Sequence, residues 1–549
     1  MATIIHQEDK RTTDSPGMES LARRRAYSRS KTALPSFYRI KHFSNHRSGT
    51  AMLTNWSVGG GRIEMSRPLE VGTWLELELK PGSASDMPIP PILRKKRRVR
   101  ARIVQEAPLL SDVEARNGYA YGLVFAVGWK TLCRYHFERA LPWIAHLLFA
   151  AGIFNVLYLK SFNLHYFWYE PLINLYSLLI SFYILSRFFL SYFYKPPRDA
   201  GYLPPVTVIV ACKNEENSIG RTLDAIYQSD YPRDRMEVIA VNDGSTDGTG
   251  GEMERAKERH PGLKIIHFDK NLGKRQGMAA GARMATGEIL VYIDSDSFVR
   301  SETIRKLVQG FSDPTVGAVC GHATVQNARK NLLTKMQEVR YFIAFRVVKA
   351  AESVFSAVTC CSGCLAAYRR KPVMEVLDTW LNQRFLGREA TFGDDRSLTN
   401  FMLRRYRVIY HSEAICTTLV PETYRQFFRQ QLRWKKSWIR ESLLAGTFMW
   451  KRHPIVAFFF YLGVLFPIIS PLIAFDNLIL PLIGYGSPSL LYIYGATLMA
   501  AVYSLYYLGR FRTGLWIYGI YFSFFYMFIL VWQTYYAVLT VRRNHWGTR

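Results

Sequence analysis

The stretch VTVIVACKNEE at residues 206–216 decides the fold of the central part of this chain, because an uninterrupted apolar run leads directly into a polar cluster. The same order recurs at residues 236–247, MEVIAVNDGSTD, and at residues 288–296, EILVYIDSD. Uninterrupted apolar runs of this length predict strands buried on both faces of a sheet. Helical patterns at residues 218–227 and 274–285 lie between these runs. The alternation predicts an α/β domain with a mixed, mostly parallel sheet.

Acidic side chains follow these predicted strands at the point where each strand ends. Glu215 follows the first strand, Asp243 the second, and Asp294 and Asp296 the last. Sheets of this kind bind ligands beyond the carboxyl ends of their strands. Two carboxylates at positions i and i+2 suit Mg²⁺ or Mn²⁺ held against phosphate oxygens. We therefore expect a metal-dependent site for a phosphate-bearing ligand; the alternative is that these residues only cap helices and form turns.

Further motifs along the chain complete this pattern. They are CCSG at residues 360–363 with YRR at 368–370, GDDR at 393–396, QQLRW at 430–434 and WGTR at 546–549. Together with the acidic residues they resemble glycosyltransferase family 2, the inverting GT-A group, over roughly residues 204–440. QxxRW is typical of the processive synthases of cellulose, chitin and hyaluronan. The CCSG and WGTR segments are similar to the hyaluronan and chitooligosaccharide synthase branch.

The resemblance implies a role for each matching residue. Asp395, beside Asp394, would take the proton of the acceptor hydroxyl, and Arg433 would offset the charge of the leaving diphosphate. Trp434 would stack on the terminal acceptor sugar, unless it is only an interfacial anchor like Trp438. The implied catalytic residues are Asp395, Asp394 and Arg433. The implied donor-binding residues are Glu215, Asp243, Lys274, Asp294, Asp296, Gln430, Arg433 and Trp434, with Asp294 and Asp296 as metal ligands. The implied acceptor-binding residues are Trp434, Cys361, Ser362 and Gly363.

The net charge of +28 favours a partner with negative charge. A nucleic acid and an anionic membrane leaflet would both serve, and the basic residues beside apolar segments favour the membrane. Seven scattered cysteines favour a reducing compartment. The CxxC at residues 361–364 has no second pair and no nearby His, so we expect no zinc there. Cys361 stays open between an acceptor-site residue and a small buried one.

Five apolar segments are long enough to cross the ~30 Å of a bilayer core. They are residues 141–159, 171–193, 454–475, 489–508 and 514–541. Pro467, Pro471 and Pro481 are expected to break the third span and the sequence after it. Five spans would leave the basic end of the chain outside, so a further short or re-entrant segment around 472–485 is the alternative. Flanking positive charge and a polar first 20 residues predict a multi-pass protein of the bacterial inner membrane with cytoplasmic domains.

The first 130 residues carry a different pattern. Alternating residues at 73–79, 99–104 and 119–127 predict strands of a small β-barrel. RAYSR at 25–29 and NWSVGG at 55–60 match RxxxR and [D/N]xSxxG, so the region resembles a PilZ domain. The resemblance implies that cyclic di-GMP binds to Arg25, Arg29, Asn55, Ser57 and Gly60. The alternative is a barrel that no longer binds this ligand.

These signals predict the organisation of the whole chain. It comprises a disordered tail at 1–20, a PilZ-like barrel at 21–130, two transmembrane helices at 138–194, a GT-A domain at 195–420, an interfacial helix with QxxRW at 421–450, three or four transmembrane helices at 454–541 and a WGTR tail at 542–549. Residues 331–350 are expected to form a second amphipathic helix.

The combined expectation is a membrane-embedded, processive β-glycosyltransferase that makes and extrudes a polysaccharide under control by cyclic di-GMP. The expected partners are a nucleotide-sugar donor, the growing polysaccharide, cyclic di-GMP, the lipid bilayer and periplasmic or outer-membrane export proteins, with no nucleic acid polymer. One alternative is a non-processive transferase acting on a lipid carrier. Another is a signal-binding protein with an inactive transferase domain, against which the retained acidic residues argue. The sugar stays open among UDP-GlcNAc, UDP-glucose, UDP-glucuronate and a GDP-linked uronate.

Overall fold

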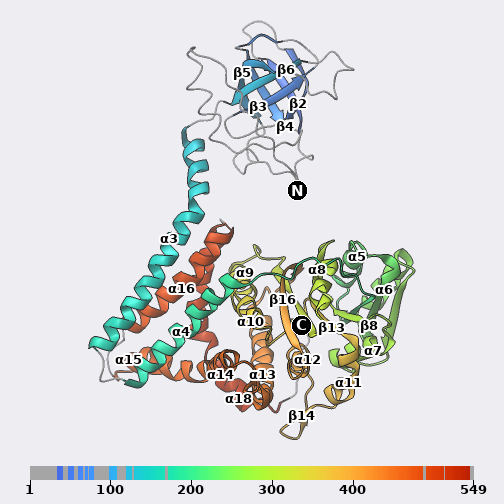
Figure 1. The fold of residues 1–549 in the computed structure, drawn as a ribbon, viewed down its shortest axis with the longest axis vertical. Helices are drawn as coiled ribbons and strands as arrows, with labels where there is room; N and C mark the ends of the chain where they lie inside the picture. The colour runs from blue at the N-terminus through green and yellow to red at the C-terminus, as the bar shows by residue number, and fades with distance from the viewer. Residues whose placement is uncertain are drawn as a thin grey trace, which may run out of the picture. The chain divides into compact units, whose positions relative to one another are not determined.

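The computed structural model shows a chain that divides into two compact units, Met1–Leu141 and Pro142–Arg549 (Figure 1). The described residues are 34–40, 47–54, 60–65, 69–71, 73–79, 98–107, 119–125, 129–166, 171–485, 490–511 and 513–543. Four of the residues expected to bind cyclic di-GMP, and the WGTR tail, lie outside them. These four are Arg25, Arg29, Asn55 and Ser57.

Six antiparallel strands of the first unit close into a barrel in the order β1-β2-β3-β6-β5-β4. The strands are β1 (Leu34–Ile40), β2 (Arg47–Thr54), β3 (Gly60–Met65), β4 (Trp74–Leu79), β5 (Arg98–Ala107) and β6 (Tyr119–Phe125). Alternate side chains fill the interior, among them Ile63, Leu75, Leu77 and Ile103. The three alternating stretches of the sequence are therefore strands β4, β5 and β6, and Gly60 begins β3.

Three described helices are long and apolar enough to cross a membrane, and a bent pair of helices makes up to four. Ala140–Tyr166 belongs to α3 (Trp129–Tyr166), and Ile173–Phe193 belongs to α4 (Pro171–Phe193). The third candidate, Pro454–Leu482, runs through α14 (Pro454–Ala474), η5 (Phe475–Ile479) and α15 (Leu480–Leu482). The bent pair is Gly514–Leu530 with Gln533–Leu539, at 44° to each other. The helix α16 (Leu490–Phe511) is not among these candidates, so five spans were expected and the described residues support three or four.

The prediction that prolines break the Pro454–Leu482 span is wrong. Pro467 and Pro471 lie inside α14, and Pro481 lies in the first turn of α15. A proline removes one backbone donor and crowds the preceding turn, but local π-helical adjustment accommodates it. The π-helical segment η5 provides that adjustment here. Residues 472–482 therefore continue one irregular helix and form no separate re-entrant segment.

The second unit contains an eight-stranded mixed sheet in the order β11-β16-β12-β13-β10-β7-β8-β9. The strands are β7 (Val206–Cys212), β8 (Met236–Asp243), β9 (Leu263–Phe268), β10 (Ile289–Tyr292), β11 (Ser297–Val299), β12 (Val316–Val325), β13 (Ala366–Arg369) and β16 (Arg407–Thr418). The neighbours β10, β7, β8 and β9 run parallel, whereas β13 is antiparallel to both of its neighbours. Every residue of β7 is buried, as the uninterrupted apolar run predicts. This is the mixed, GT-A-like sheet that the sequence predicts.

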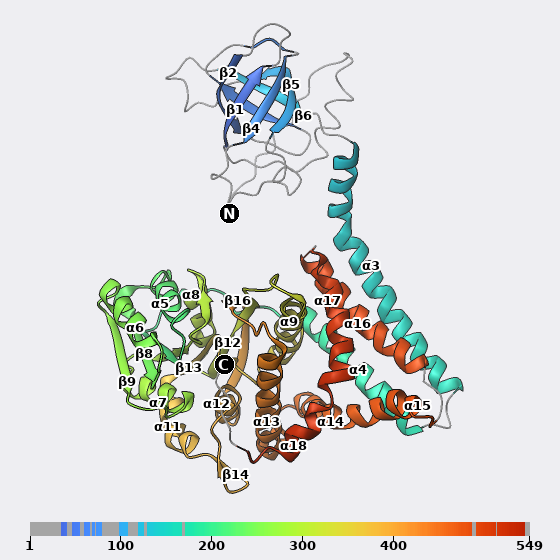
Figure 2. The same ribbon diagram turned by 180° about the vertical axis from the view of Figure 1, so that it is seen from behind.

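Helices cover both faces of this sheet. Figures 1 and 2 show α7 (Lys274–Met284) and α11 (Arg370–Leu381) on one side, and α5 (Ile219–Tyr227) and α8 (Thr303–Val308) on the other.

Two helical segments link the sheet to the C-terminal helices. The helix α12 (Asp394–Leu403) packs on α13 (Tyr424–Met449), which in turn contacts α14 and α18 (Gln533–Leu539). The predicted helix at 331–350 is α9 (Leu332–Ile343) followed by a π-helical segment, η4 (Ala344–Lys349), and α10 (Ala350–Val354). Because α13 touches both α12 and the apolar helices, the QxxRW motif lies at the junction between the sheet domain and the C-terminal helices.

Candidate active site

The strand order brings the predicted acidic residues to one edge of the sheet. The strands β7, β8 and β10 are parallel neighbours, so their carboxyl ends lie side by side. Glu215 follows β7, Asp243 ends β8, and Asp294 follows β10. The topology therefore forms the acidic edge expected from the sequence, at the position where open α/β sheets bind their ligands.

The carboxylates of Asp294 and Asp395 come close together at Gly363. A Cβ atom built on Gly363 would lie 2.8 Å from Asp395 Oδ1 and 3.0 Å from Asp294 Oδ1. The backbone N–H of Gly363 faces the Asp395 carboxyl closely enough to oppose the rise of its pKa. A side chain at this position would therefore push the two carboxylates apart, and glycine is required for their close approach. The predicted base Asp395 and the predicted metal ligand Asp294 thus border the same space.

Lys274 supplies the positive charge of this centre. Its Nζ atom forms an ion pair with Asp294 Oδ1. Burial alone would lower the pKa of the Lys274 ammonium, but the neighbouring Asp294 and Asp395 outweigh burial and raise its pKa. Burial lowers the pKa of Arg433 from its usual range, and the same carboxylates oppose this shift. Lys274 and Arg433 are therefore both within electrostatic reach of the carboxylates, and both stay cationic at neutral pH.

Asp395 has the environment of a general base. Burial, then the charges of Asp294 and Asp394, raise the pKa of its carboxyl above the ordinary range, although Lys274 acts in the opposite direction. A carboxylate whose pKa is raised toward the working pH accepts a proton more readily in the transition state. The geometry is therefore consistent with the role that the resemblance implies for Asp395.

Asp394 points away from this centre into the protein. Its Oδ1 lies 2.8 Å from Arg275 Nε, and the two side chains are only 3% and 5% exposed. Arg275 also donates to the carbonyl of Trp380 at 2.9 Å and to Gln383 Oε1 at 3.2 Å. Asp394 was expected to be catalytic. Its buried ion pair with Arg275 holds the first turn of α12, on which Asp395 lies, and the catalytic role stays a prediction.

A second buried pair fixes α12 against α13. Glu441 Oε1 accepts from Arg440 Nε at 2.8 Å, and Glu441 Oε2 accepts from Asn400 Nδ2 of α12 at 3.0 Å. Gln383 Nε2 donates to the same Glu441 carboxylate at 3.2 Å. Because Gln383 also contacts Arg275, one continuous network runs from the ion pair of Asp394 to the QxxRW helix. Arg275, Gln383 and Glu441 were not singled out from the sequence. Arg440 was expected only as one of the basic residues around QxxRW at a membrane surface, whereas it is buried in this network.

The residues expected at the nucleotide are held by local hydrogen bonds. Asp243 accepts from the backbone N–H groups of Leu272 at 2.7 Å and of Gly273 at 3.0 Å, and burial raises the pKa of its carboxyl. It thereby fixes the loop that precedes Lys274. Glu215 accepts from Ser218 Oγ at 2.8 Å in the loop after β7. Both lie at the acidic edge, where a nucleotide would reach them.

The predicted metal ligands are two carboxylates, Asp294 and Asp296. Asp296 is buried, and its Oδ1 accepts from Thr418 Oγ1 at 3.4 Å. Among the described residues, no three His, Cys, Asp or Glu side chains gather closely enough to hold a metal ion by themselves. Mg²⁺ is commonly bound by one or two carboxylates and completes its shell with substrate phosphates and water. The donor set fits such a substrate-completed site at Asp294 and Asp296.

The predicted acceptor segment divides into a part that faces the carboxylates and a part that does not. Gly363 borders Asp294 and Asp395, and Ser362 is half-buried. Cys361 is fully buried, and its N–H donates to Thr399 Oγ1 at 2.9 Å. Of the two interpretations left open by the sequence, the burial favours Cys361 as a small core residue.

The QxxRW motif lies on α13 and places Trp434 at the surface of the site. The Trp434 side chain is 39% exposed, and the Arg340 guanidinium lies 5.4 Å from its ring centroid. Trp438, one turn further along, is half-buried. Gln430 precedes Trp434 by one turn, and its Oε1 is buried with no hydrogen-bond partner in the described part of the chain. An exposed indole face suits the CH-rich face of a sugar.

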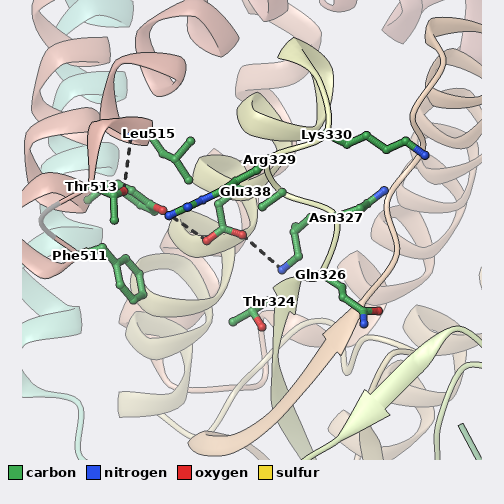
Figure 3. Close-up of a pocket in the computed structure, with 12 residues that line it drawn as sticks. Thr324, Gln326, Asn327, Arg329, Lys330, Glu338, Phe511, Thr513 and Leu515 are labelled. Atoms are coloured by element: carbon green, nitrogen blue, oxygen red, sulfur yellow. Dashed lines mark hydrogen bonds between the residues drawn. The ribbon is translucent and has the colours of Figure 1, made fainter. Parts of the chain in front are cut away.

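A separate cavity of about 560 Å³ lies between the segment after β12 and the ends of the C-terminal helices (Figure 3). Glu338 lies at its centre and accepts from the backbone N–H of Val325 at 3.3 Å and from the Tyr507 hydroxyl at 3.4 Å. None of the predicted site residues lines it. The carboxylate centre is therefore distinct from this cavity.

Comparison with known proteins shows what this domain is similar to. Residues 207–377 match the model of the Glycosyl transferase family 2 family. An N-acetylglucosaminyltransferase of Rhizobium meliloti is 37% identical over 48% of this chain, and one of Bradyrhizobium diazoefficiens is 34% identical over 49%. The matched region covers 62% and 56% of those two proteins. Residues 207–377 are thus similar to the domains of glycosyltransferase family 2.

Two further similarities extend over more of the chain. A hyaluronan synthase of Streptococcus pyogenes is 29% identical over 73% of this chain and 97% of its own length. A mannosyltransferase of Pyrobaculum calidifontis, solved with GDP-Man and Mn²⁺, is 27% identical and covers 64% of this chain and 98% of its own, with a TM-score of 0.46. The synthase match covers more of the chain than the family model does.

Proposed function

We propose that the chain is a membrane-embedded, inverting and processive β-glycosyltransferase that polymerises a polysaccharide from a nucleotide-sugar donor. The observation that carries this proposal is the convergence of Asp294, Asp395 and Lys274 around Gly363 at the edge of the sheet. Arg433 lies within electrostatic reach of the same carboxylates, and Trp434 follows it with an exposed ring. This arrangement combines a base, a centre for a leaving diphosphate and an aromatic surface for a sugar.

In this proposal the acceptor hydroxyl oxygen attacks the anomeric carbon of the donor sugar. Asp395 takes the hydroxyl proton as the new carbon–oxygen bond forms, and the bond to the diphosphate breaks, so that the nucleoside diphosphate leaves. Lys274 and Arg433 offer positive charge to the leaving group. Asp294 and Asp296 would hold Mg²⁺ or Mn²⁺, which when bound neutralises charge on the diphosphate. The close approach of Gly363 would leave room for Asp395 beside Asp294.

Processivity and membrane extrusion are supported by the placement of α13. This helix carries QxxRW, contacts the base helix α12 and packs against the apolar helices α14 and α18. An acceptor chain bound at Trp434 would therefore begin next to the C-terminal helices. The proposed location is the bacterial inner membrane, with the catalytic domain in the cytoplasm, where flanking positive charge is favoured. The names of the relatives favour a donor that carries N-acetylglucosamine, alone or alternating with a second sugar.

We also propose control by cyclic di-GMP through the N-terminal barrel. The support is the pair of sequence motifs that supply Arg25, Arg29, Asn55 and Ser57, together with Gly60 at the start of β3 of a closed barrel. Guanidinium groups bind phosphates and stack on guanine, which suits this ligand. The ligand would act by binding one conformation of the enzyme more tightly than another.

Nucleotide release by the purified full-length protein tests the proposed function. The assay covers a panel of UDP- and GDP-sugars with Mg²⁺ or Mn²⁺, with and without cyclic di-GMP. We expect release with one donor or one pair of donors, stimulated by cyclic di-GMP and reduced by about 10²–10⁴-fold in Asp395→Asn. Equal release by wild type and Asp395→Asn would contradict the assigned base. Absence of release under every condition would contradict the proposed function.

A further inference from the structure

The cavity around Glu338 carries charges of both signs on its wall. The wall includes the carboxylate of Glu338 from α9 and the basic side chains of Arg329 and Lys330 from the segment after β12 (Figure 3). Arg329 lies within electrostatic reach of the Tyr507 hydroxyl, which donates to Glu338. Lys330 Nζ lies 2.6 Å from Glu422 Oε2, so a neighbouring carboxylate offsets its charge. A ligand that complements this wall therefore carries both a cationic and an anionic group.

Glu338 is the place for the cationic group. The backbone N–H of Val325 donates to its carboxylate at 3.3 Å, and the Tyr507 hydroxyl donates at 3.4 Å. Both distances are at the long end for hydrogen bonds, and a carboxylate has room for further donors. Burial raises the pKa of the Glu338 carboxyl, and a bound ammonium would favour its charged form.

The cavity also lies at the end of a candidate membrane span. Leu515 is part of its wall and belongs to Gly514–Leu530, the first half of the bent pair that could cross a membrane. Phe511, the last residue of α16, lines the cavity too and is 40% exposed. Aromatic and basic side chains gather at the level of lipid headgroups. The charged wall is therefore next to an apolar one at the boundary of a span.

We propose that this cavity binds the headgroup of a zwitterionic phospholipid. The ammonium group of the lipid donates to the Glu338 carboxylate, its phosphate accepts from Arg329, and its acyl chains leave past Phe511 and Leu515. A volume of about 560 Å³ is within the range of small-ligand sites. The inference uses the membrane embedding of the proposed function and none of its chemistry.

Other ligands match only part of this wall. A phosphatidylglycerol headgroup brings a phosphate to Arg329 but no cation to Glu338. A quaternary ammonium is a cation without N–H groups, so it donates no hydrogen bond to Glu338. Free phosphoethanolamine carries both charges but has no chains to cover Phe511 and Leu515. Each of these three compounds therefore tests one part of the assignment.

A bound headgroup would stabilise the segment that leads into α13. Asn327, two residues before Arg329, donates from Nδ2 to the Val420 carbonyl at 2.9 Å and accepts from the Val420 N–H at 3.0 Å. Its Nδ2 also donates to Glu422 Oε1 at 3.0 Å. These residues lie just before Thr423, the N-cap of α13. A lipid that holds Arg329 therefore also holds the start of α13, and it should raise the unfolding temperature of the protein.

The test is lipid binding by delipidated full-length protein in detergent. The probes are dihexanoyl phosphatidylethanolamine, dihexanoyl phosphatidylcholine, dihexanoyl phosphatidylglycerol and O-phosphoethanolamine. The apparent Kd is measured from the shift of the unfolding temperature with probe concentration, and native mass spectrometry checks that the probe is retained. The variants are Glu338→Gln and Arg329→Gln. Glu258→Gln is the matched control, because Glu258 is exposed on α6 (Thr249–Arg259) and does not line the cavity.

Phosphatidylethanolamine should bind at least about 10-fold more tightly than each of the other probes. Glu338→Gln and Arg329→Gln each remove a charged hydrogen bond and should weaken its binding by about 10-fold. Glu258→Gln should bind it like the wild type. If Glu338→Gln does not fold, Glu338→Asp keeps the charge on a shorter side chain and should weaken binding by a smaller factor.

Three results would overturn the proposal. Phosphatidylethanolamine affinity in the Glu338 and Arg329 variants equal to that of the wild type would show that the cavity is not the site. Equal or tighter binding of phosphatidylglycerol would leave Glu338 without a role, and equal binding of O-phosphoethanolamine would remove the lipid. Absence of nucleotide release by the wild type would overturn the proposed function instead, since lipid binding is measured without any donor.

Discussion

Gly363→Ala is the substitution that most directly probes the carboxylate centre. The new Cβ would lie 2.8 Å from Asp395 Oδ1 and 3.0 Å from Asp294 Oδ1, whereas ordinary contacts begin at 3.4 Å. Each carboxylate must therefore retreat by about half an ångström to restore an ordinary contact. Because a misplacement of about 1 Å can cost about 10²-fold in rate, we expect kcat to fall by about 10–100-fold.

The assay is nucleotide release at saturating donor, with the amount of folded protein checked by thermal unfolding. Gly251→Ala is the control, since its Cβ would meet only Arg255 Nη1 at 3.8 Å on the exposed face of α6 (Thr249–Arg259). That variant should keep wild-type kcat and be slightly more stable, because alanine favours a helix. Wild-type kcat in folded Gly363→Ala would refute the reasoning that these carboxylates must meet at residue 363.

Three further predictions follow from the ion pairs and the barrel. Asp394→Asn removes a negative charge that raises the pKa of Asp395. The acid limb of the kcat–pH profile should therefore move to lower pH by about one unit. A move to higher pH would contradict the electrostatic argument. Glu441→Gln leaves the buried Arg440 without its charge partner and should destabilise the protein by about 3 kcal/mol. Thermal inactivation should therefore begin at a lower temperature, and unchanged stability would contradict the argument. Arg29→Ala should abolish cyclic di-GMP binding in calorimetry and its stimulation of activity while basal activity remains, and retained binding would count against the PilZ resemblance.

The sheet and the acidic edge could be predicted because both depend on local sequence. Uninterrupted apolar runs mark β7, β8 and β10, and parallel strands bring their following residues together whatever the rest of the chain does. Motif resemblance then singled out Asp395 and Arg433. It did not reveal that Asp394 is turned toward Arg275, since two adjacent acids in a motif look alike until the helix fixes their directions.

Contacts between distant segments could not be predicted. The Glu441 network joins residues separated by 41 and 58 positions, and no periodicity in the sequence announces such pairs. In the sequence Arg340 is one more basic residue of an amphipathic helix. Only the structure shows that Phe522 of α17 (Ile517–Phe525) lies against it. The prolines of the Pro454–Leu482 span led to a wrong prediction for a different reason. Proline usually interrupts a helix, but here the helix continues through a π-helical segment.

The measurement that tests the central claim most directly is the size of the product made in a single encounter with the enzyme. Full-length protein is given a short pulse of labelled donor followed by a large excess of unlabelled donor, and the labelled chains are sized. A processive synthase predicts label inside long polymers from the earliest time points, and none in Asp395→Asn. Label confined to a single sugar on a lipid carrier, or to short chains that lengthen together with time, would contradict the account.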